Sequence, residues 1–340
     1  MKTSSLTLTR RTMILTGSAL LASPAVAQTD PWQAVSDRAR GMDQCHALMI
    51  RIGGTEMLAE TYRGPSLGRA VPVKSVSKTI VAALTGAALD RGEIPSVSAT
   101  LGELTPQLVP DNADPRVAAL TVENLVTMQA GLERTSGGNY GRWISSRNWV
   151  SNALSRPFVA EPGRVMLYST GSFHILGAVL SEVAGESLLS LARSRLGVPL
   201  GIEIPAWTRD PQGRYLGGNE MALTLAAMAR FGELYLAKGA WNGEQVLSRE
   251  WVDASLQSRT RSPYSGLNYG YGWFLGRSGG ADYALARGYG GQVICIAPEL
   301  GLSLALTSDP ALPARSAGHF GDIMRLIEES VIPAARAVSL

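Results

Sequence analysis

The chain has 340 residues, of which 45% are hydrophobic and 17% are charged, and its formal net charge is +3 at pH 7. Residues 1–27 carry three positive charges and no negative one, so the charge of the remaining chain falls from +3 to 0. This composition is that of a globular protein with a substantial core, in one large or two modest domains. It excludes the strongly basic character from which a nucleic-acid or anionic-surface partner would be inferred.

Residues 1–27 have the pattern of an export signal. Arg10 and Arg11 precede an apolar run over residues 13–21, and residues 25–27 supply the small side chains of a cleavage site. The paired arginines indicate the twin-arginine type, so we expect a periplasmic or secreted protein. An N-terminal anchor helix is the alternative, but the apolar run is too short to span a bilayer. No second stretch is long enough to cross a membrane.

The next part of the chain predicts two strands and a helix. Residues 47–62 alternate around a turn at Gly53 and Gly54, which is typical of a hairpin. Apolar residues then recur at helical spacing over residues 76–91, which predicts a buried helix. Residues 101–262 are mostly helical by pattern. Three helices are expected there. The first starts at Thr121 and is broken at Gly131, and the second covers 171–195 with an interruption near Gly185. The third starts at Thr224, whose side chain can cap it.

Strand patterns return towards the end of the chain, over residues 271–275, 283–286, 292–297 and 302–307, before a closing helix over 316–334. The simplest packing joins both ends of the chain in one antiparallel sheet. The predicted fold class is therefore α+β, with a discontinuous sheet domain (28–100 and 265–340), a mainly helical domain (101–264) and a cleft between them.

The cysteines and histidines are few. Cys45 and Cys295 both lie in apolar strand-like segments, so a disulfide and two buried free thiols are both open from the residues alone. His46, His174 and His319 form no cluster with cysteines. We therefore expect no zinc site and no metal or organic cofactor.

Ser75 and Lys78 form the first candidate for chemistry. Only four of the 31 basic residues are lysines, and Lys78 is one of them. A desolvated lysine can become neutral, whereas an arginine cannot. Ser75 at a helix start would expose its hydroxyl and its own N–H, with Lys78 one turn on among apolar neighbours. A helix cap followed by a solvated lysine is the alternative reading of this spacing.

Two further segments complete a constellation. Tyr168, Ser169 and Thr170 follow a Pro-Gly turn and precede a helix, and a tyrosine there can relay a proton between a serine and a neutral lysine. Residues 286–292 predict a strand that ends in a glycine-rich turn. Glycines let a substrate lie against a strand edge, where a backbone N–H can stabilise an oxyanion.

The order and spacing of these segments resemble the serine β-lactamase-like hydrolases, which include class C β-lactamases, D-alanyl-D-alanine peptidases, family VIII carboxylesterases and 6-aminohexanoate-dimer hydrolases. The resemblance covers residues 45–335. Residues 75–78 resemble the SxxK motif, 168–170 the Tyr-x-Asn motif, and 286–288 the Lys-Thr-Gly, His-x-Gly or Trp-Gly-Gly motif. Further similar stretches are 120–132, 217–218 and, closest to the 6-aminohexanoate-dimer hydrolase branch, 207–213 and 290–292.

The resemblance implies roles for individual residues. Ser75 would be the acylated nucleophile, and Lys78 and Tyr168 the base and proton relay. The N–H groups of Ser75 and Tyr289 would form the oxyanion hole. The implied substrate-binding residues are Thr170, Ala286, Arg287 and Gly288. The family's strand order would also place Cys45 and Cys295 on non-neighbouring strands, which favours free thiols.

Two departures from the family pattern affect the expected substrate. Thr170 stands in place of the asparagine, and Ala286 in place of the lysine that lies near the substrate carboxylate. Strand alternation is expected to point the adjacent Arg287 to the opposite face. We therefore expect hydrolysis of a small-molecule ester or linear amide more than of a β-lactam, with the oligomeric state left open.

Two other functions fit parts of the sequence. A non-catalytic protein that binds peptidoglycan or a partner protein would tolerate the changes at Thr170 and Ala286, but has no need of the intact Ser75, Lys78 and Tyr168. A Ser-His-Asp hydrolase could use the G-x-S-x-G matches at Ser66 or Ser278. Neither serine is predicted to lie on a strand-to-helix elbow, as that motif requires.

Overall fold

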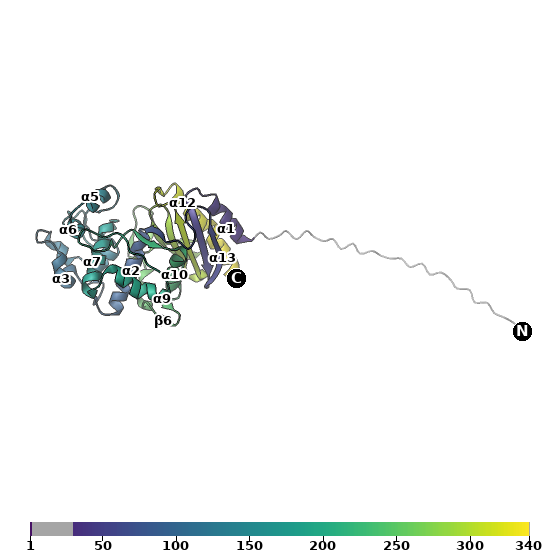
Figure 1. The fold of residues 1–340 in the computed structure, drawn as a ribbon, viewed down its shortest axis with the longest axis horizontal. Helices are drawn as coiled ribbons and strands as arrows, with labels where there is room; N and C mark the ends of the chain where they lie inside the picture. Colours follow the sequence, from purple (N-terminus) through teal and green to yellow (C-terminus); the bar gives the residue numbers. More distant parts are fainter. Residues whose placement is uncertain (2–29, 340) are drawn as a thin grey trace.

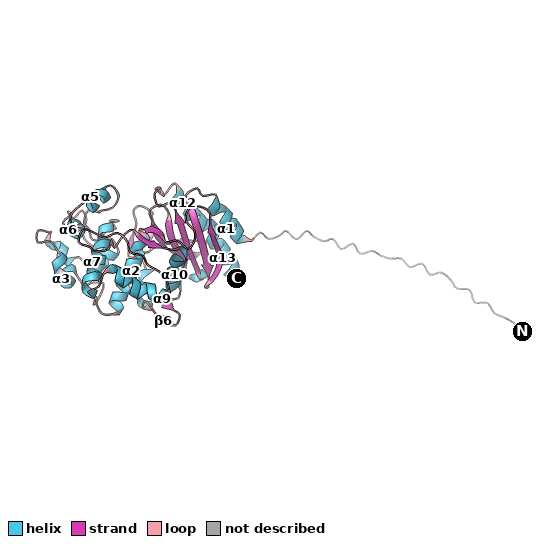
Figure 2. Cartoon of the chain, in the orientation of Figure 1, coloured by secondary structure: helices cyan, strands magenta, loops and turns pink. Residues whose placement is uncertain are grey.

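The computed structural model describes residue 1 and residues 30–339. The predicted export signal therefore lies outside the described residues, apart from Met1. The described chain forms a sheet with helices on both faces and a larger group of helices beyond one of them (Figures 1 and 2). This arrangement is of the α+β class that the sequence predicted.

An eight-stranded antiparallel sheet takes strands from both ends of the chain, in the order β2-β1-β12-β11-β10-β9-β8-β7. Central strands β11 and β12 are buried along their whole length, because helices cover both faces. The strand bounds are β1 (Cys45–Ile52), β2 (Thr55–Thr61), β7 (Thr260–Arg261), β8 (Asn268–Tyr269), β9 (Phe274–Ser278), β10 (Ala281–Gly288), β11 (Gln292–Ala297) and β12 (Leu302–Ser308). Because β7 begins at Thr260, the sheet includes residues that the predicted boundary at 265 gave to the helical domain.

Strand β12 lies between β1 and β11 and separates the two cysteines. Cys45 pairs with Ser308, and Cys295 pairs with Leu304. Both thiols are free and buried, which confirms the implication of the strand order. Burial raises the pKa of Cys45 to about 12, so this thiol stays protonated and unreactive in the fold.

Different helices cover the two faces of the sheet (Figure 1). On the inner face, α10 (Leu225–Leu236) packs against β1, β11 and β12, and α2 (Val76–Asp90) packs against β10 and β11. The outer face carries α1 (Pro31–Arg40), α12 (His319–Leu326) and α13 (Ile332–Ser339). The inner helices connect the sheet to the helical side of the molecule.

The helical side is built from short helices around the buried α7 (Figure 2). These are α3 (Leu101–Leu104), α4 (Val122–Val126), α5 (Tyr140–Ile144), α6 (Trp149–Leu154), α7 (Thr170–Ala184), α8 (Leu188–Ala192) and α9 (Val198–Leu200); α11 (Arg249–Ser255) follows α10. Gly185 ends α7 in the left-handed conformation, at the predicted interruption. The Thr224 hydroxyl accepts the Ala227 N–H and caps α10, also as predicted.

Three predicted boundaries are wrong. Helix α4 ends at Val126 and not at Gly131, because Met128 adopts a left-handed backbone (φ 57°). The strand expected over 271–275 begins only at Phe274, because Gly272 lies in a turn (φ 81°) against α2. The closing helix is interrupted by a π-helical turn, Ile327–Val331.

One feature of the fold, helix α1, lay outside these predictions. Helix α1 starts at Pro31, where the Asp30 side chain accepts the Trp32 N–H. None of the described helices alone is long and apolar enough to cross a membrane. Only α7 taken together with 188–200, as a bent pair, meets the length and composition for a span.

Candidate active site

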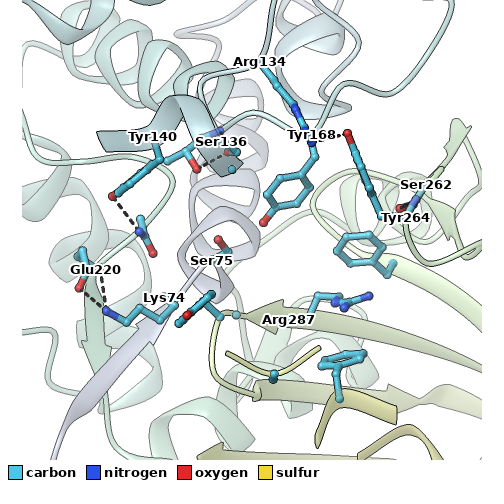
Figure 3. Close-up of a pocket in the computed structure, with 18 of the residues that line it drawn as sticks. Lys74, Ser75, Arg134, Ser136, Tyr140, Tyr168, Glu220, Ser262, Tyr264 and Arg287 are labelled. Atoms are coloured by element: carbon cyan, nitrogen blue, oxygen red, sulfur yellow. Dashed lines mark hydrogen bonds and ion pairs between the residues drawn. The ribbon is translucent and has the colours of Figure 1, made fainter. Parts of the chain in front are cut away.

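Ser75 lies at the junction between strand β3 (Val71–Lys74) and helix α2. Its hydroxyl makes no cap hydrogen bond, so it is free for chemistry. The preceding residue, Lys74, has a left-handed backbone (φ 52°), which costs a non-glycine residue about 1–3 kcal/mol. An ion pair with Glu220 (3.0 Å) holds its side chain. This strained turn presents the Ser75 hydroxyl to the cavity (Figure 3).

Lys78 is almost fully buried (2% exposed) one turn beyond Ser75. Its Nζ lies 3.0 Å from Ser75 Oγ, 3.4 Å from Thr170 Oγ1 and 2.6 Å from the carbonyl oxygen of Gly218. An ammonium group has three N–H donors, one for each contact, whereas a neutral amine would direct its lone pair at one of the two hydroxyls. Desolvation lowers the pKa of Lys78, and the nearby Tyr168 opposes the shift. The Lys78 amine therefore lies within hydrogen-bond distance of the Ser75 hydroxyl, in surroundings that favour its neutral form.

Tyr168 and Thr170 reach the same point from the start of α7. The Tyr168 hydroxyl points towards Ser75 (Figure 3), and Lys78 Nζ lies 4.9 Å from the centre of the tyrosine ring. Thr170 is fixed by Ser136, whose Oγ accepts the Thr170 N–H (2.8 Å) and lies 2.9 Å from Thr170 Oγ1. The structure thus brings the first two predicted motifs together around Ser75.

The third predicted motif forms the opposite wall. Gly288 ends β10 so close to β3 that a Cβ there would lie 2.4 Å from the carbonyl oxygen of Val73. Tyr289 follows in the turn and lines the cavity with Ser75. Neither the Ser75 N–H nor the Tyr289 N–H donates to another backbone group of the described chain. Both are available to a substrate oxygen.

The expected facing of Arg287 was wrong, and Ala286 does not lie where the resemblance implied. Arg287 lines the cavity, whereas Ala286 is buried and does not. Alternation does separate the two side chains, but it cannot tell which face borders the cavity. The guanidinium lies over the rings of Phe320 (3.6 Å) and Phe274 (5.2 Å), which hold it in the wall. No carboxylate of the described residues pairs with it.

The cavity around Ser75 has a volume of about 570 Å³. On the helical side it is further lined by Arg134, Gly137, Tyr140, Asn219 and Glu220. Ser262 and Tyr264 come from the connection between β7 and β8, and Pro310, Ala314 and Phe320 from the chain after β12. The Arg134 guanidinium donates to the Tyr264 hydroxyl across the cavity (Figure 3). The space fits a small molecule.

Sequence reasoning gave no role to several residues of this site. Gly218 contributes a backbone carbonyl, which leaves no side-chain signal in the sequence. Arg134, Glu220 and Tyr264 come from loops that lie far from the three motifs in the chain. Their charge or aromatic character alone did not distinguish them from ordinary surface residues.

The serines of the two G-x-S-x-G matches do not line this cavity. Ser278 lies on β9 and Ser66 in a loop. His319, the histidine nearest the end of the chain, contacts Ser308 instead (2.8 Å). Within residues 30–339, no group of three or more His, Cys, Asp or Glu side chains is placed to hold a metal ion.

The antiparallel sheet with its flanking helices and the helical lobe form the β-lactamase/transpeptidase-like fold, as the sequence predicted. A family model described as Beta-lactamase matches residues 40–319, and the chain belongs to this family. No curated protein sequence matches the chain.

Solved structures show the same fold at low identity. A candidate 6-aminohexanoate-dimer hydrolase from Bacillus anthracis has a TM-score of 0.73 and 19% identity, over 90% of this chain and 81% of the other. EstCE1, a hydrolase with promiscuous acyltransferase activity, has a TM-score of 0.72 and 17% identity, over 87% and 99%. A penicillin-binding protein homologue from Caulobacter crescentus has a TM-score of 0.69 and 17% identity, over 92% and 98%.

Proposed function

We propose that the protein is a serine hydrolase that cleaves an ester or a linear amide through an acyl-enzyme on Ser75. The observation that carries the proposal is the buried Lys78 amine, which lies 3.0 Å from the Ser75 hydroxyl. This hydroxyl stands at a helix start and makes no capping hydrogen bond. A binding protein would gain nothing from burying a lysine beside a serine, because burial costs free energy unless the neutral amine has a use. The beta-lactamase family membership and the hydrolases among the structural neighbours support the class.

In the acylation step, Ser75 Oγ attacks the substrate carbonyl carbon and its proton passes to the lone pair of Lys78. The N–H groups of Ser75 and Tyr289 stabilise the oxyanion. Collapse of the tetrahedral intermediate breaks the C–O or C–N bond, and the proton returns through Tyr168 to the leaving group. Water then attacks the acyl carbon, gives one proton to the same relay, and Ser75 leaves with its hydroxyl restored.

Two features of the cavity favour particular substrates. Thr170 replaces an amide side chain, which favours esters and linear amides over β-lactams. Arg287 adds a cation that pairs with no carboxylate within residues 30–339, so substrates that carry a carboxylate belong beside neutral ones in the activity screen. The screen should include p-nitrophenyl esters, linear amides, D-amino-acid peptides and a chromogenic cephalosporin.

The test of the reaction is covalent labelling. A fluorophosphonate probe is expected to label the wild-type protein and to spare Ser75→Ala, while Ser66→Ala and Ser278→Ala label like the wild type. Equal labelling of wild type and Ser75→Ala would contradict the proposal. Turnover of a p-nitrophenyl ester that is lost in Ser75→Ala and Lys78→Ala would exclude a purely binding function.

We further propose that the protein works outside the cytoplasm. The support is the sequence of residues 1–27, with Arg10 and Arg11 before a short apolar run. N-terminal sequencing of the protein recovered from the periplasm or medium should start after residue 27. A protein that stays in the cytoplasm with Met1 intact would contradict export.

A further inference from the structure

The segment Gly217–Gly218 connects Lys78 to a second pair of titratable side chains. The Gly218 carbonyl accepts from Lys78 Nζ at 2.6 Å. The N–H of the preceding residue, Gly217, donates to His174 Nδ1 at 3.4 Å. His174 Nε2 in turn lies 3.1 Å from Asp210 Oδ2. The mechanism above does not use His174 or Asp210.

The hydrogen bonds of Asp210 fix the protonation of the histidine ring. Asp210 Oδ1 accepts the backbone N–H groups of Gln212 (2.9 Å) and Arg214 (2.8 Å), which leaves Oδ2 for His174. A carboxylate only accepts, so His174 Nε2 carries the proton. The lone pair of Nδ1 therefore faces the Gly217 N–H. The arrangement works only with this tautomer.

The surroundings keep the imidazole neutral. His174 is fully buried, and the rings of Trp143 and Trp149 stand edge-on at 5.7 and 5.6 Å. These tryptophans are uncharged, so the charged groups that face His174 are Asp210 and Arg214, and Arg214 is paired with Glu182 on α7. Desolvation lowers the pKa of His174, opposed by Asp210. The ring is a fixed hydrogen-bond acceptor at neutral pH.

Close packing leaves the glycine segment little freedom. A Cβ at Gly217 would lie 2.2 Å from the Phe173 carbonyl oxygen, and one at Gly218 would lie 2.9 Å from the Thr170 carbonyl oxygen. The segment therefore lies directly on the first turns of α7. Contact with α7 limits its approach on one side, and the bond to His174 Nδ1 holds it from moving away.

We propose that His174 and Asp210 are positioning residues, which hold Gly217–Gly218 so that the Gly218 carbonyl keeps Lys78 Nζ beside Ser75 Oγ. The inference concerns the position and protonation of Lys78, and its catalytic consequence rests on the function proposed above. A carbonyl acceptor favours the ammonium form of lysine. Loss of that acceptor should therefore lower the pKa of Lys78 and release its amine from Ser75.

Asp210→Asn tests the proposal without a change of shape. The asparagine oxygen keeps the two backbone N–H groups, so its NH₂ faces His174 Nε2 and drives the proton to Nδ1. Two N–H groups then oppose each other at Gly217. His174→Asn is the matched comparison, because its side-chain oxygen can still accept the Gly217 N–H. Trp149→Phe disturbs the packing of His174 and leaves the hydrogen bonds intact.

The first readout does not depend on turnover. The full chain has four lysines, so NMR of ¹⁵Nζ-labelled lysine gives a small set of signals, and the Lys78 signal is assigned by its loss in Lys78→Met. In Asp210→Asn the Lys78 signal should titrate at lower pH than in the wild type. In His174→Asn and Trp149→Phe it should titrate close to the wild type, even where the melting temperature falls.

The second readout is the rate of fluorophosphonate labelling of Ser75. We expect a fall of about tenfold or more in Asp210→Asn, and a fall of under about threefold in the two comparison variants, at equal folded fraction. An unchanged or raised Lys78 titration in Asp210→Asn would overturn the inference. If Asp210→Asn does not fold, His174→Gln replaces it with the same expected results, because its NH₂ can still donate to Asp210 but its oxygen does not occupy the position of Nδ1 that faces the Gly217 N–H. If the fluorophosphonate does not label Ser75 of the wild-type protein, the proposed function is refuted. The NMR titration of Lys78 still decides whether His174 and Asp210 are positioning residues.

Discussion

The two walls of the active-site cavity differ in how completely they are fixed. On the helical wall, Lys78 and Thr170 are buried and every polar atom of the Lys78 amine has a partner. On the sheet wall, Tyr289 is 54% exposed and Arg287 pairs with no carboxylate among the described residues. The helical wall keeps Ser75, Lys78 and Tyr168 of the family motifs and departs from them at Thr170, whereas the sheet wall departs at Ala286. We therefore expect the helical wall to carry the proton transfer and the sheet wall to select the substrate.

The largest expected effect comes from the helical wall. Lys78→Met keeps the length and apolar body of the side chain but removes the proton acceptor. We expect kcat/KM for a p-nitrophenyl ester to fall by about 10⁴ or more, as for other nucleophile-base pairs. Lys238→Met, at a surface ion pair with Asp253, is the control. A fall of less than about tenfold would assign the proton transfer to another group.

Gly288→Ala tests whether the sheet wall contributes to the reaction at all. The added Cβ would lie 2.4 Å from the Val73 carbonyl oxygen, so the Gly288–Tyr289 turn has to move. We expect kcat to fall by about tenfold to a hundredfold and stability by about 1–3 kcal/mol. Gly68→Ala, where a Cβ meets nothing within 4 Å, should change neither quantity. An unaltered kcat in Gly288→Ala would remove Tyr289 from the oxyanion hole.

Arg287→Gln addresses the selectivity of the sheet wall. A charge-assisted hydrogen bond is worth about 1.5–3 kcal/mol, so the preference for a carboxylate-bearing ester over its neutral analogue should fall about tenfold to a hundredfold. Competition between the two esters in one assay measures this ratio. Arg277→Gln, on the neighbouring strand and paired with Asp282, should leave it unchanged. An equal ratio in wild type and Arg287→Gln would show that the guanidinium only packs on its phenylalanine rings.

The smallest effect is on stability as a function of pH. The folded-state pKa of Lys78 is lowered below its ordinary value of 10.5, so the unfolded chain binds the extra proton between the two values. Stability should therefore rise with pH across that window. The difference in unfolding free energy between wild type and Lys78→Met, from urea titrations at several pH values, isolates this contribution. If this difference in unfolding free energy does not depend on pH, burial does not shift the pKa of Lys78.

The comparison of the two walls also explains what the sequence could predict. The helical wall was predictable because its information is local: Ser75 and Lys78 are one turn apart, and Tyr168 and Thr170 are neighbours. The direction of the Arg287 side chain was not predictable. Alternation places Arg287 and Ala286 on opposite faces of the strand, but it does not tell which face borders the cavity. The guanidinium is held by Phe274 on β9 and Phe320 on α12. Strands β10, β11 and β12 lie between these two elements in the chain.

Backbone groups and backbone strain were equally hidden. The Gly218 carbonyl contacts Lys78 across 140 residues of sequence and has no side chain to signal its role. The left-handed Met128 that ends α4 early is a residue type that rarely adopts this conformation, so the apolar pattern ran past it. One antiparallel sheet from both ends of the chain was predictable because both ends carry strand patterns, and the resemblance implied that Cys45 and Cys295 lie on non-neighbouring strands.

The pairing of β1 with β12 joins residues 45–52 to residues 302–308, one strand in from the sheet edge at β2. Chains dominated by such distant contacts fold slowly, because the loop between the partners must close before the pairing is rewarded. Ser75 and Lys78 are made early, but the strands that complete the wall opposite them are among the last to leave the ribosome. Ser75, the proposed nucleophile, therefore meets Tyr289 of the proposed oxyanion hole only when synthesis is nearly finished. We expect a nascent chain to show no hydrolase activity.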